Sequence, residues 1–222
     1  MNKRLLKCAE FVKGDFLCDI GTDHAYLPVY LVQKGVCKRA LACDIAKGPL
    51  QSAKSNISLA GLQDEIQTVL SNGLQSVDLQ GVTDLVIAGM GGELIAEILS
   101  FKKELFGINL VLQPNSKAPE LRRFLAKNGF EILQETAVQD GDFCYLVINA
   151  KCGSTPYELS ETQAVLGKLS LKTADEKAYA YEQATRLQTA SAGLKKSGNA
   201  ENLALAEKYT SLANEILKRI GE

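Results

Sequence analysis

Apolar residues along the chain follow two different spacings. Short continuous apolar runs, which are typical of buried strands, lie at residues 16–20, 40–44, 66–70, 84–88 and 110–112. Apolar residues that recur every three or four positions predict helices at residues 25–34, 48–60, 94–98 and 118–127. Because strand, loop and helix repeat in this order, the chain is predicted to form a parallel sheet with helices on both faces.

The last two β-type runs, at residues 130–138 and 143–150, follow one another without a helix between them. Asp140-Gly141 lies in the connection, and this dipeptide favours a tight hairpin turn. We therefore expect six or so parallel strands closed by one antiparallel hairpin. An amphipathic helix at residues 3–12 is expected to cover one end of the sheet, or alternatively to bring its basic residues to a phosphate backbone.

Beyond residue 154 the β-type residues disappear, and alanine, leucine and charged residues dominate. Residues 160–195 and 200–220 are predicted to be two long helices, with a turn at residues 196–199. The second helix carries apolar residues at spacings of three and four: Leu205, Tyr209, Leu212, Ile216 and Ile220. The pattern predicts an antiparallel coiled-coil hairpin. It divides the chain into residues 1–154, a sheet domain, and residues 155–222, a helical domain.

The overall charge limits the classes of partner. The net charge is −1 and the pI is about 6.0, so any nucleic-acid binding must come from a local patch. Such a patch at the mouth of the predicted crevice could be formed by nine basic residues: Lys3, Arg4, Lys7, Lys13, Lys38, Arg39, Lys117, Arg122 and Arg123.

The six cysteines form no C-x-x-C pair, and the chain has a single histidine. We therefore expect buried free thiols and no metal site. The N-terminal residues lack the apolar core of a signal peptide, and no run of 18 apolar residues occurs anywhere. A cytoplasmic protein that does not enter the membrane is therefore expected.

The loop after the first predicted strand carries the first candidate chemistry. In open α/β sheets, ligands bind beyond the carboxyl ends of the strands. Here the strand ends at Asp19 and Ile20, and Gly21-Thr22-Asp23 follows without the glycine pattern of a dinucleotide loop or the lysine of a phosphate-binding loop. A glycine turn beside acids suits a ligand that has a cationic end and no phosphate. S-adenosylmethionine, with its methionine ammonium, fits that description.

Three further strand ends complete a possible nucleoside site. Asp44 ends the second predicted strand, where a carboxylate can accept hydrogen bonds from both ribose hydroxyls. Asn72-Gly73 follows the third, where an amide could contact adenine. Residues 88–92 follow the fourth and are rich in glycine, which would expose the backbone and leave room for a flat base. The alternatives are ordinary ones: a cap or turn residue at Asp44, and plain tight turns at the other two.

Four segments resemble those of a known family. They are Asp19-Ile20-Gly21-Thr22-Asp23-His24-Ala25-Tyr26-Leu27-Pro28, Ser71-Asn72-Gly73-Leu74, Ile87-Ala88-Gly89-Met90-Gly91-Gly92 and Leu112-Gln113-Pro114-Asn115. Together they resemble the bacterial tRNA (adenine(22)-N(1))-methyltransferase family over residues 3–150, and the helical tail is similar to that family's coiled-coil domain. Residues 88–91 stand in place of the Asn-Pro-Pro-aromatic signature of many amino-methylating enzymes.

The resemblance implies a doubly wound, Rossmann-like class I methyltransferase fold that uses S-adenosylmethionine to methylate N1 of adenine 22 in the D-loop region of tRNA. Ten residues are then expected to bind the cofactor: Asp19, Gly21, Thr22, Asp44, Ile45, Asn72, Gly73, Ala88, Gly89 and Met90.

Catalysis is expected to involve Asp23, His24 and Tyr26. N1 of adenine can attack a sulfonium methyl directly, so the enzyme chiefly aligns the reactants and stabilises the positive charge that develops on the ring. We expect the carboxylate of Asp23 to provide that stabilisation, with His24 and Tyr26 stacking on or orienting the base. The alternatives are that Asp23 only caps a helix, that His24 lies on the surface and that Tyr26 packs in the core.

Two other functions remain open from the sequence. One is a methyltransferase that acts on a protein or a small molecule. The other is a non-catalytic nucleotide-binding module whose helical hairpin docks a protein partner. The sequence does not decide between a monomer and a homodimer.

Overall fold

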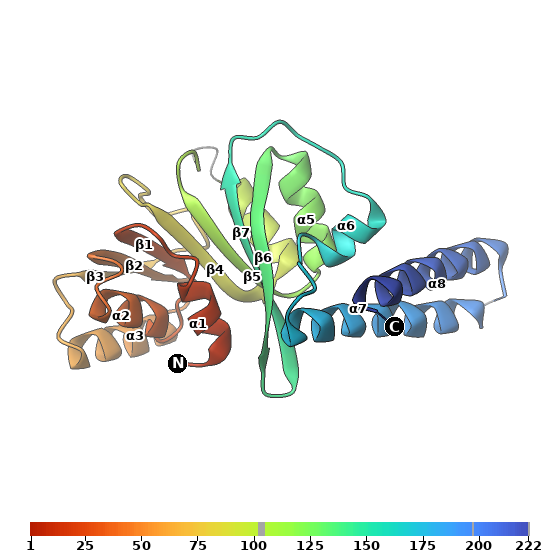
Figure 1. Ribbon diagram of the computed structural model, residues 1–222. Coiled ribbons are helices and arrows are strands. Elements are labelled where there is room, and N and C mark those ends of the chain that lie inside the picture. Colours follow the sequence, from red (N-terminus) through yellow and green to blue (C-terminus); the bar gives the residue numbers. More distant parts are fainter. Residues whose placement is uncertain (102–104, 197, 222) are drawn as a thin grey trace.

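A computed structural model describes residues 1–101, 105–196 and 198–221, and it contains one seven-stranded sheet (Figure 1). The strands are β1 (Phe16–Ile20), β2 (Arg39–Asp44), β3 (Ile66–Leu70), β4 (Asp84–Gly91), β5 (Asn109–Ser116), β6 (Phe130–Asp140) and β7 (Phe143–Cys152). The helices are α1 (Lys3–Ala9), α2 (Tyr26–Gln33), α3 (Lys47–Leu59), α4 (Gly92–Ser100), α5 (Ala118–Lys127), α6 (Glu161–Leu166), α7 (Ala174–Lys195) and α8 (Ala200–Ile220).

The strand order is β3-β2-β1-β4-β5-β7-β6. Strands β1 to β5 pair in parallel, whereas β7 lies antiparallel between β5 and β6. The chain moves outward from β1 to β3 and then returns to place β4 on the other side of β1. This reversal opens a crevice at the carboxyl ends of β1 and β4. The predicted mostly parallel sheet with an antiparallel hairpin is confirmed, with five parallel strands where about six were expected, and the hairpin inserts its second strand into the sheet.

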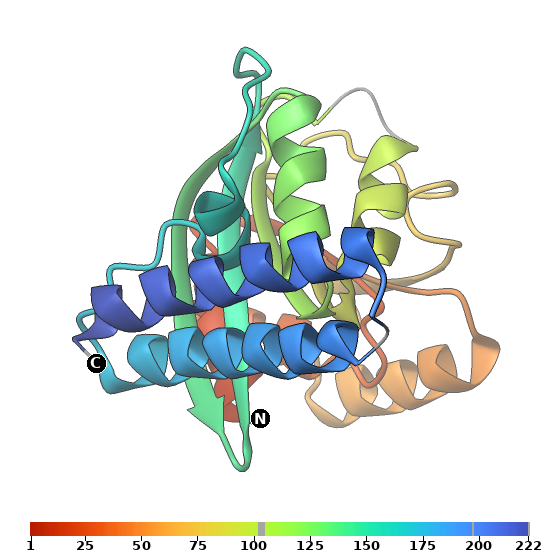
Figure 2. The same ribbon diagram turned by 90° about the vertical axis from the view of Figure 1, so that its right-hand side faces the viewer.

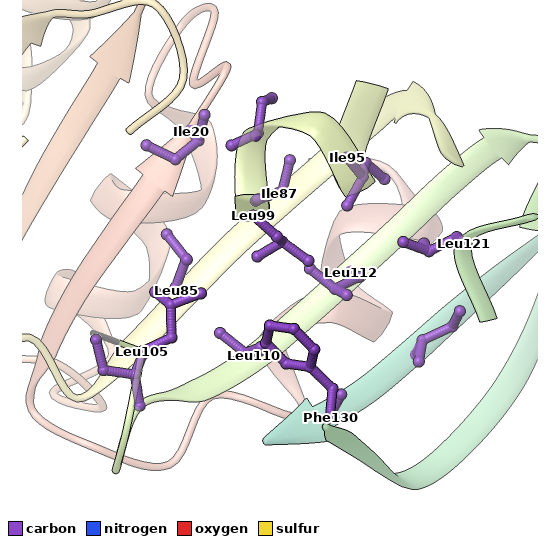
Figure 3. Packing of buried hydrophobic residues seen from close by; sticks show 14 of the residues in the cluster. Ile20, Leu85, Ile87, Ile95, Leu99, Leu105, Leu110, Leu112, Leu121 and Phe130 are labelled. Carbon is purple, nitrogen blue, oxygen red and sulfur yellow. The ribbon is translucent and has the colours of Figure 1, made fainter. Parts of the chain in front are cut away.

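The two faces of the sheet are covered by different helices. Side chains alternate along each strand, so Leu17 and Val86 face one apolar layer and Cys18 and Leu85 face the other. The first layer contains apolar residues of α1, α2 and α3, and the second contains those of α4 and α5. Figure 3 shows the second layer, where leucines of β4 and β5 pack beneath Ile95 and Leu99 of α4.

The prediction of one long helix at residues 160–195 is wrong, because this region forms two helices, α6 and α7. Gly167 ends α6 with a φ of 61°, and a Cβ atom there would lie 1.7 Å from Oε2 of Glu135. No L-residue could hold that conformation in that space. The chain restarts at Thr173, whose side chain caps α7 by accepting a hydrogen bond from the Glu176 amide.

Helices α7 and α8 lie antiparallel and project from the β6–β7 side of the sheet, away from β3 (Figures 1 and 2). Residues 200–220 form α8 as predicted, whereas the turn predicted at residues 196–199 includes Ser197, which lies outside the described residues. Leu212, Ile216 and Ile220 are buried in the predicted seam, but Leu205 is exposed. Ala206 is fully buried instead, and its carbonyl accepts a hydrogen bond from the Ser191 hydroxyl of α7. Supercoiling of the pair remains a prediction.

A buried ion pair joins the helical segment to the sheet. The guanidinium of Arg122 in α5 donates from Nε to Oε1 of Glu135 in β6 at 2.7 Å, and both side chains are completely buried. The same guanidinium donates to the carbonyls of Ala164 and Val165 in α6, each at 2.8 Å. The Lys168 amide donates to the other oxygen of Glu135. Arg122 therefore fastens α6 to the sheet, and its predicted place in a surface patch is wrong.

We expect Arg122→Met to lower the free energy of unfolding by about 3–5 kcal/mol, because it leaves the Glu135 carboxylate buried without its opposite charge. The neighbouring Arg123→Met is a matched control. Arg123 pairs with Glu161 at 2.7 Å on the surface, where such pairs contribute about 0–1 kcal/mol. Urea unfolding of the two variants measures the difference, and equal midpoints would contradict the proposed attachment.

Candidate functional site

The loop after β1 crosses the end of β2. The backbone amides of Gly21 and Thr22 both donate to the Cys43 carbonyl, each at 2.9 Å. Gly21 has a φ of 74°, and a Cβ atom there would lie 2.3 Å from the Cε methyl of Met90. Gly21 therefore gives the turn its positive φ without strain, and it lies against the Met90 side chain at the end of β4. The two loops on either side of the crevice touch at this point.

Asp44 connects the loops that follow β1, β2 and β3. Its carboxylate accepts hydrogen bonds from the Asp23 amide at 3.2 Å and from the Ala46 amide at 3.0 Å. Its backbone carbonyl accepts one from the Ser71 amide at 2.9 Å. A carboxylate has about four acceptor positions, so two remain for a ligand. The three strand ends that the sequence singled out therefore lie together.

Asp19 is a second, more deeply buried carboxylate in the same place. Burial raises its pKa from 3.8 to about 6, and the Asp44 carboxylate adds to the rise, while Thr22 and Arg4 oppose it. The Thr22 hydroxyl oxygen is also buried, and it makes no hydrogen bond of normal geometry within the described residues. Two neighbouring acids whose charge is poorly compensated favour a cationic ligand.

Apolar side chains flank the ends of β2 and β3. Ile45 is 65% exposed and Leu70 is 48% exposed, and Leu70 pairs in register with Asp44, next to Ile45. Large exposed apolar side chains beside a polar crevice suit the face of a base. Asn72 is exposed in the next loop, and Gly73, with a φ of 55°, would place a Cβ atom 2.9 Å from Ile98 of α4. Leu70 was not among the predicted site residues.

The end of β4 is held by a hydrogen-bond network that was not predicted from the sequence. The Gly89 amide donates to Oε1 of Gln113 at 3.0 Å, and the Gly89 carbonyl accepts from the Asn115 side chain at 2.8 Å. The Arg4 guanidinium, from α1, donates to the same oxygen of Gln113. The bulge at Gly89, with a φ of 81°, lets pairing continue beyond Ala88, so β4 and β5 are longer than predicted. The signal available in the sequence was a glutamine, Gln113, directly after the apolar run of β5.

Asp23, His24 and Tyr26 lie at the opening of the crevice. The His24 and Tyr26 rings are stacked with centroids 5.2 Å apart, and Oδ1 of Asp23 lies 3.6 Å from Nε2 of His24. The Asp23 side chain is 68% exposed and Tyr26 is 52% exposed. The capping alternative for Asp23 is wrong, because Ala25 is the N-cap of α2 and no side chain caps it. The core alternative for Tyr26 is wrong as well.

The predicted basic patch does not form as a whole, although one of its members, Arg4, reaches Gln113 beside the crevice. Three members of the patch precede or begin strands: Lys13, Lys38 and Arg39. They therefore lie at the amino ends of the strands, whereas the crevice lies at the carboxyl ends. Lys38 pairs with Asp15 at 2.7 Å, and the Arg39 guanidinium lies 3.9 Å from the Phe16 ring centre. Among the described residues, no group of three metal-ligating side chains occurs and no helix is long and apolar enough to cross a membrane.

Comparisons with known proteins agree with this geometry. Residues 1–148 match a family model described as a methyltransferase domain. The chain is 38% identical over 156 residues to the tRNA (adenine(22)-N(1))-methyltransferase of Bacillus subtilis, covering 69% of this chain and 66% of that protein.

Two solved structures resemble the chain over nearly its full length. One is Sp1610 of Streptococcus pneumoniae in complex with S-adenosyl-L-methionine, with 33% identity, a TM-score of 0.84 and coverage of 98% of this chain and 99% of that one. The other is TrmK of M. capricolum in complex with S-adenosyl-homocysteine, with 29% identity, a TM-score of 0.80 and coverage of 99% and 97%.

We expect Asp19→Asn to become more stable relative to the parent as the pH rises. Asp19 has a higher pKa in the folded state than in the unfolded state, so its ionisation destabilises the parent as pH rises from 4 through 6. The difference in unfolding free energy between the two proteins should shift by about 2 kcal/mol between pH 4 and pH 8. Denaturant unfolding of both proteins across this pH range measures the shift. A difference that stays constant with pH would show that burial does not raise the pKa of Asp19.

Proposed function

The chain belongs to the tRNA (adenine(22)-N(1))-methyltransferase family, and from that premise we propose how its own residues serve the reaction. The protein is an enzyme that uses S-adenosyl-L-methionine to methylate N1 of adenine 22 in tRNA. One observation in this molecule supports the assignment best. The carboxylates of Asp19 and Asp44 lie near each other, beside a loop that lacks the glycine pattern of a pyrophosphate-binding site.

The residues present fit S-adenosyl-L-methionine. We assign the methionine ammonium to the side of the crevice formed by Asp19, Gly21 and Thr22, because the acidic character of that side is poorly compensated. We assign the ribose hydroxyls to the free acceptor positions of Asp44. The adenine would lie against Ile45 at the end of β2.

The rest of the proposed cofactor set lies at the next two strand ends. Asn72 and Gly73 follow β3, where an amide group can contact the adenine edge. Ala88, Gly89 and Met90 follow the regular part of β4 and bring backbone atoms to the reacting methyl. Met90 already touches the Gly21 turn, so it borders both the cofactor and the base.

When bound, S-adenosyl-L-methionine would supply a sulfonium methyl for the in-plane lone pair of adenine N1 to attack, and the positive charge would pass from the departing sulfur to the ring. We propose that the Asp23 carboxylate stabilises that charge, because it is exposed at the opening of the crevice and free of any capping role. The stacked rings of His24 and Tyr26 would orient the base from the same side. The Arg4–Gln113 network would hold the Gly89 backbone still during transfer.

We propose a division of labour between residues 1–154, which bind the cofactor and carry the chemistry, and residues 155–222, which help to bind tRNA. The helical segment projects from the sheet and so extends the surface beside the crevice. We also propose that the protein works in the cytoplasm, where tRNA and the cofactor are both available.

The experiment that tests the function is incubation of the purified protein with labelled S-adenosyl-L-methionine and unmodified tRNA, followed by nucleoside analysis. Label in 1-methyladenosine that disappears when adenine 22 is replaced by guanine is the expected result. Label only in co-purifying protein or small molecules would favour a different substrate, and binding without any transfer would favour a non-catalytic module.

We expect Asp44→Ala to weaken cofactor binding roughly 10- to 150-fold, because hydrogen bonds to a charged group contribute about 1.5–3 kcal/mol. Asp64→Ala removes an exposed carboxylate before β3 and serves as the control. Calorimetric titration measures both affinities. If a folded Asp44→Ala variant bound the cofactor as tightly as the control, Asp44 would have no place in the site.

Asp23→Asn tests the catalytic assignment without disturbing the loop. The backbone at Asp23 has a φ of 54°, which asparagine tolerates as well as aspartate does, and no cap is lost. We expect the single-turnover methylation rate to fall about 10- to 100-fold at saturating cofactor and tRNA, because the charge that stabilises the cationic base is removed. Asp78→Asn is the surface control. A rate within about twofold of the control would remove Asp23 from the chemistry.

A further inference from the structure

Arg4 of α1 lies beside the proposed reaction site, and it is partly buried. Its guanidinium forms no ion pair among the described residues. Four other arginines each pair with a glutamate: Arg122, Arg123, Arg186 and Arg219. A partly buried cation without a counter-charge has lost some of its contact with water, so it favours an anionic ligand.

Three groups hold the Arg4 guanidinium on the α1 side of the sheet. Gln113 and Tyr145 are odd-numbered residues of β5 and β7, whose odd-numbered side chains face the layer that contains α1. Gln113 accepts a hydrogen bond from Nη1 of Arg4, and the Tyr145 ring centre lies 5.7 Å from the guanidinium carbon. A Cβ atom at Gly89 would lie 3.2 Å from Nη1, so the guanidinium also lies against the end of β4. The positive charge is therefore fixed next to the crevice.

Most hydrogen-bond donors of the Arg4 guanidinium remain available. An arginine side chain has five N–H donors. In the part of the chain that the structure describes, one of them is used, by Gln113. Gln113 and Asn115 bond to each other and to the Gly89 peptide, so they do not compete for a ligand. The planar fork of a guanidinium matches the two oxygens of a carboxylate, which it can bind through two parallel hydrogen bonds.

The acidic side of the crevice lies close to the Arg4 guanidinium. Burial has the largest effect on the pKa of Asp19 and raises it, whereas Arg4 is near enough to act in the opposite direction. The turn after Asp19 also meets the end of β4, because Gly21 lies against the Met90 side chain. An acid and a base therefore border the same part of the crevice. This arrangement suits a zwitterion, such as the ammonium and carboxylate groups of an amino acid.

A tRNA phosphate is the other anion to consider for this part of the molecule. Binding of a nucleic-acid backbone comes from several cations that act together. The start of α1 does not offer them, because two acids lie among its basic residues. The Asp140 carboxylate accepts a hydrogen bond from the Arg4 amide at 3.2 Å, and Lys7 pairs with Glu10 at 2.7 Å. The observations therefore favour the cofactor over the RNA backbone as the source of the anion.

We propose that Arg4 binds the carboxylate of the methionine part of S-adenosyl-L-methionine, next to the ammonium site of Asp19, Gly21 and Thr22. The inference rests on the proposed function, because it adds a residue to the same cofactor site. It gives α1 a role in cofactor binding that was not predicted from the sequence. Through Gln113, the residue that holds the carboxylate is also linked to the Gly89 peptide.

A binding test compares two ligands that differ by the carboxylate. Decarboxylated S-adenosylmethionine keeps the sulfonium and an ammonium group but has no carboxylate. Arg4→Gln is expected to weaken binding of S-adenosyl-L-methionine about 10- to 150-fold, the range for a hydrogen bond to a charged group. Binding of the decarboxylated ligand is expected to change less than about threefold. Calorimetric titration measures the four affinities. An equal loss for both ligands would overturn the proposal, because Arg4 would then only support the crevice.

Two further variants serve as controls. Arg4→Lys keeps the positive charge and is expected to retain part of the preference for the ligand with the carboxylate. Arg39→Gln removes an arginine that stacks on Phe16 at the amino ends of the strands, and it is expected to bind both ligands as the parent does. If Arg4→Gln does not fold, the parent still decides the question. Equal affinity of the parent for the two ligands would overturn the proposal.

A tRNA-binding measurement separates this proposal from a role in substrate binding. The parent and Arg4→Gln are titrated with tRNA at saturating S-adenosyl-homocysteine, so that no transfer occurs. Equal tRNA affinities are expected. A loss of tRNA affinity with unchanged cofactor affinity would overturn the proposal in favour of a phosphate contact. A parent that prefers the ligand with the carboxylate but does not methylate adenine 22 would keep the Arg4 site and overturn the proposed function.

Discussion

The two hydrogen bonds from Gly21 and Thr22 to the Cys43 carbonyl are the contact on which the site depends. They turn the loop after β1 sideways over β2, at a positive φ that glycine adopts without strain next to Met90. Once the loop lies there, the Asp23 amide reaches the Asp44 carboxylate, and Asp44 is linked in turn to the loop after β3. One backbone turn therefore decides where both acids and the candidate catalytic residues lie.

The opposite wall of the crevice is organised by side chains instead of backbone. Gln113 is completely buried, and its oxygen accepts from both Arg4 and the Gly89 amide. A buried amide oxygen with two donors is well satisfied, so the bulge at Gly89 has a single stable position. The crevice thus combines an acidic wall, which carries uncompensated charge, with a wall whose polar groups are internally paired. A ligand that is cationic at one end and meets a neutral base at the other suits this asymmetry.

The sequence predicted the parts of the molecule that depend on local pattern. The period of apolar residues located the seven strands, and the acids at the ends of β1 and β2 indicated the crevice. It failed where a tertiary contact overrides that pattern. Residues 160–195 look helical throughout, but Gly167 must fit against the Arg122–Glu135 pair, whose members lie far away in the sequence. Lys38 and Arg39 look available for RNA, yet Lys38 precedes β2 and Arg39 begins it, so both lie at the amino ends of the strands, away from the crevice.

The same buried pair changes how the helical segment should be understood. Its apolar cluster is separate from the two layers of the sheet, as expected for an added domain, but Tyr179 of α7 belongs to the core of the sheet, and α6 supplies carbonyls to Arg122. Removing residues 155–222 would expose a guanidinium and a carboxylate that pair at zero accessibility. A truncated protein would therefore lose stability as well as its helical segment. Point substitutions in α7 and α8 that leave the Arg122–Glu135 pair intact are the means of separating substrate recognition from folding.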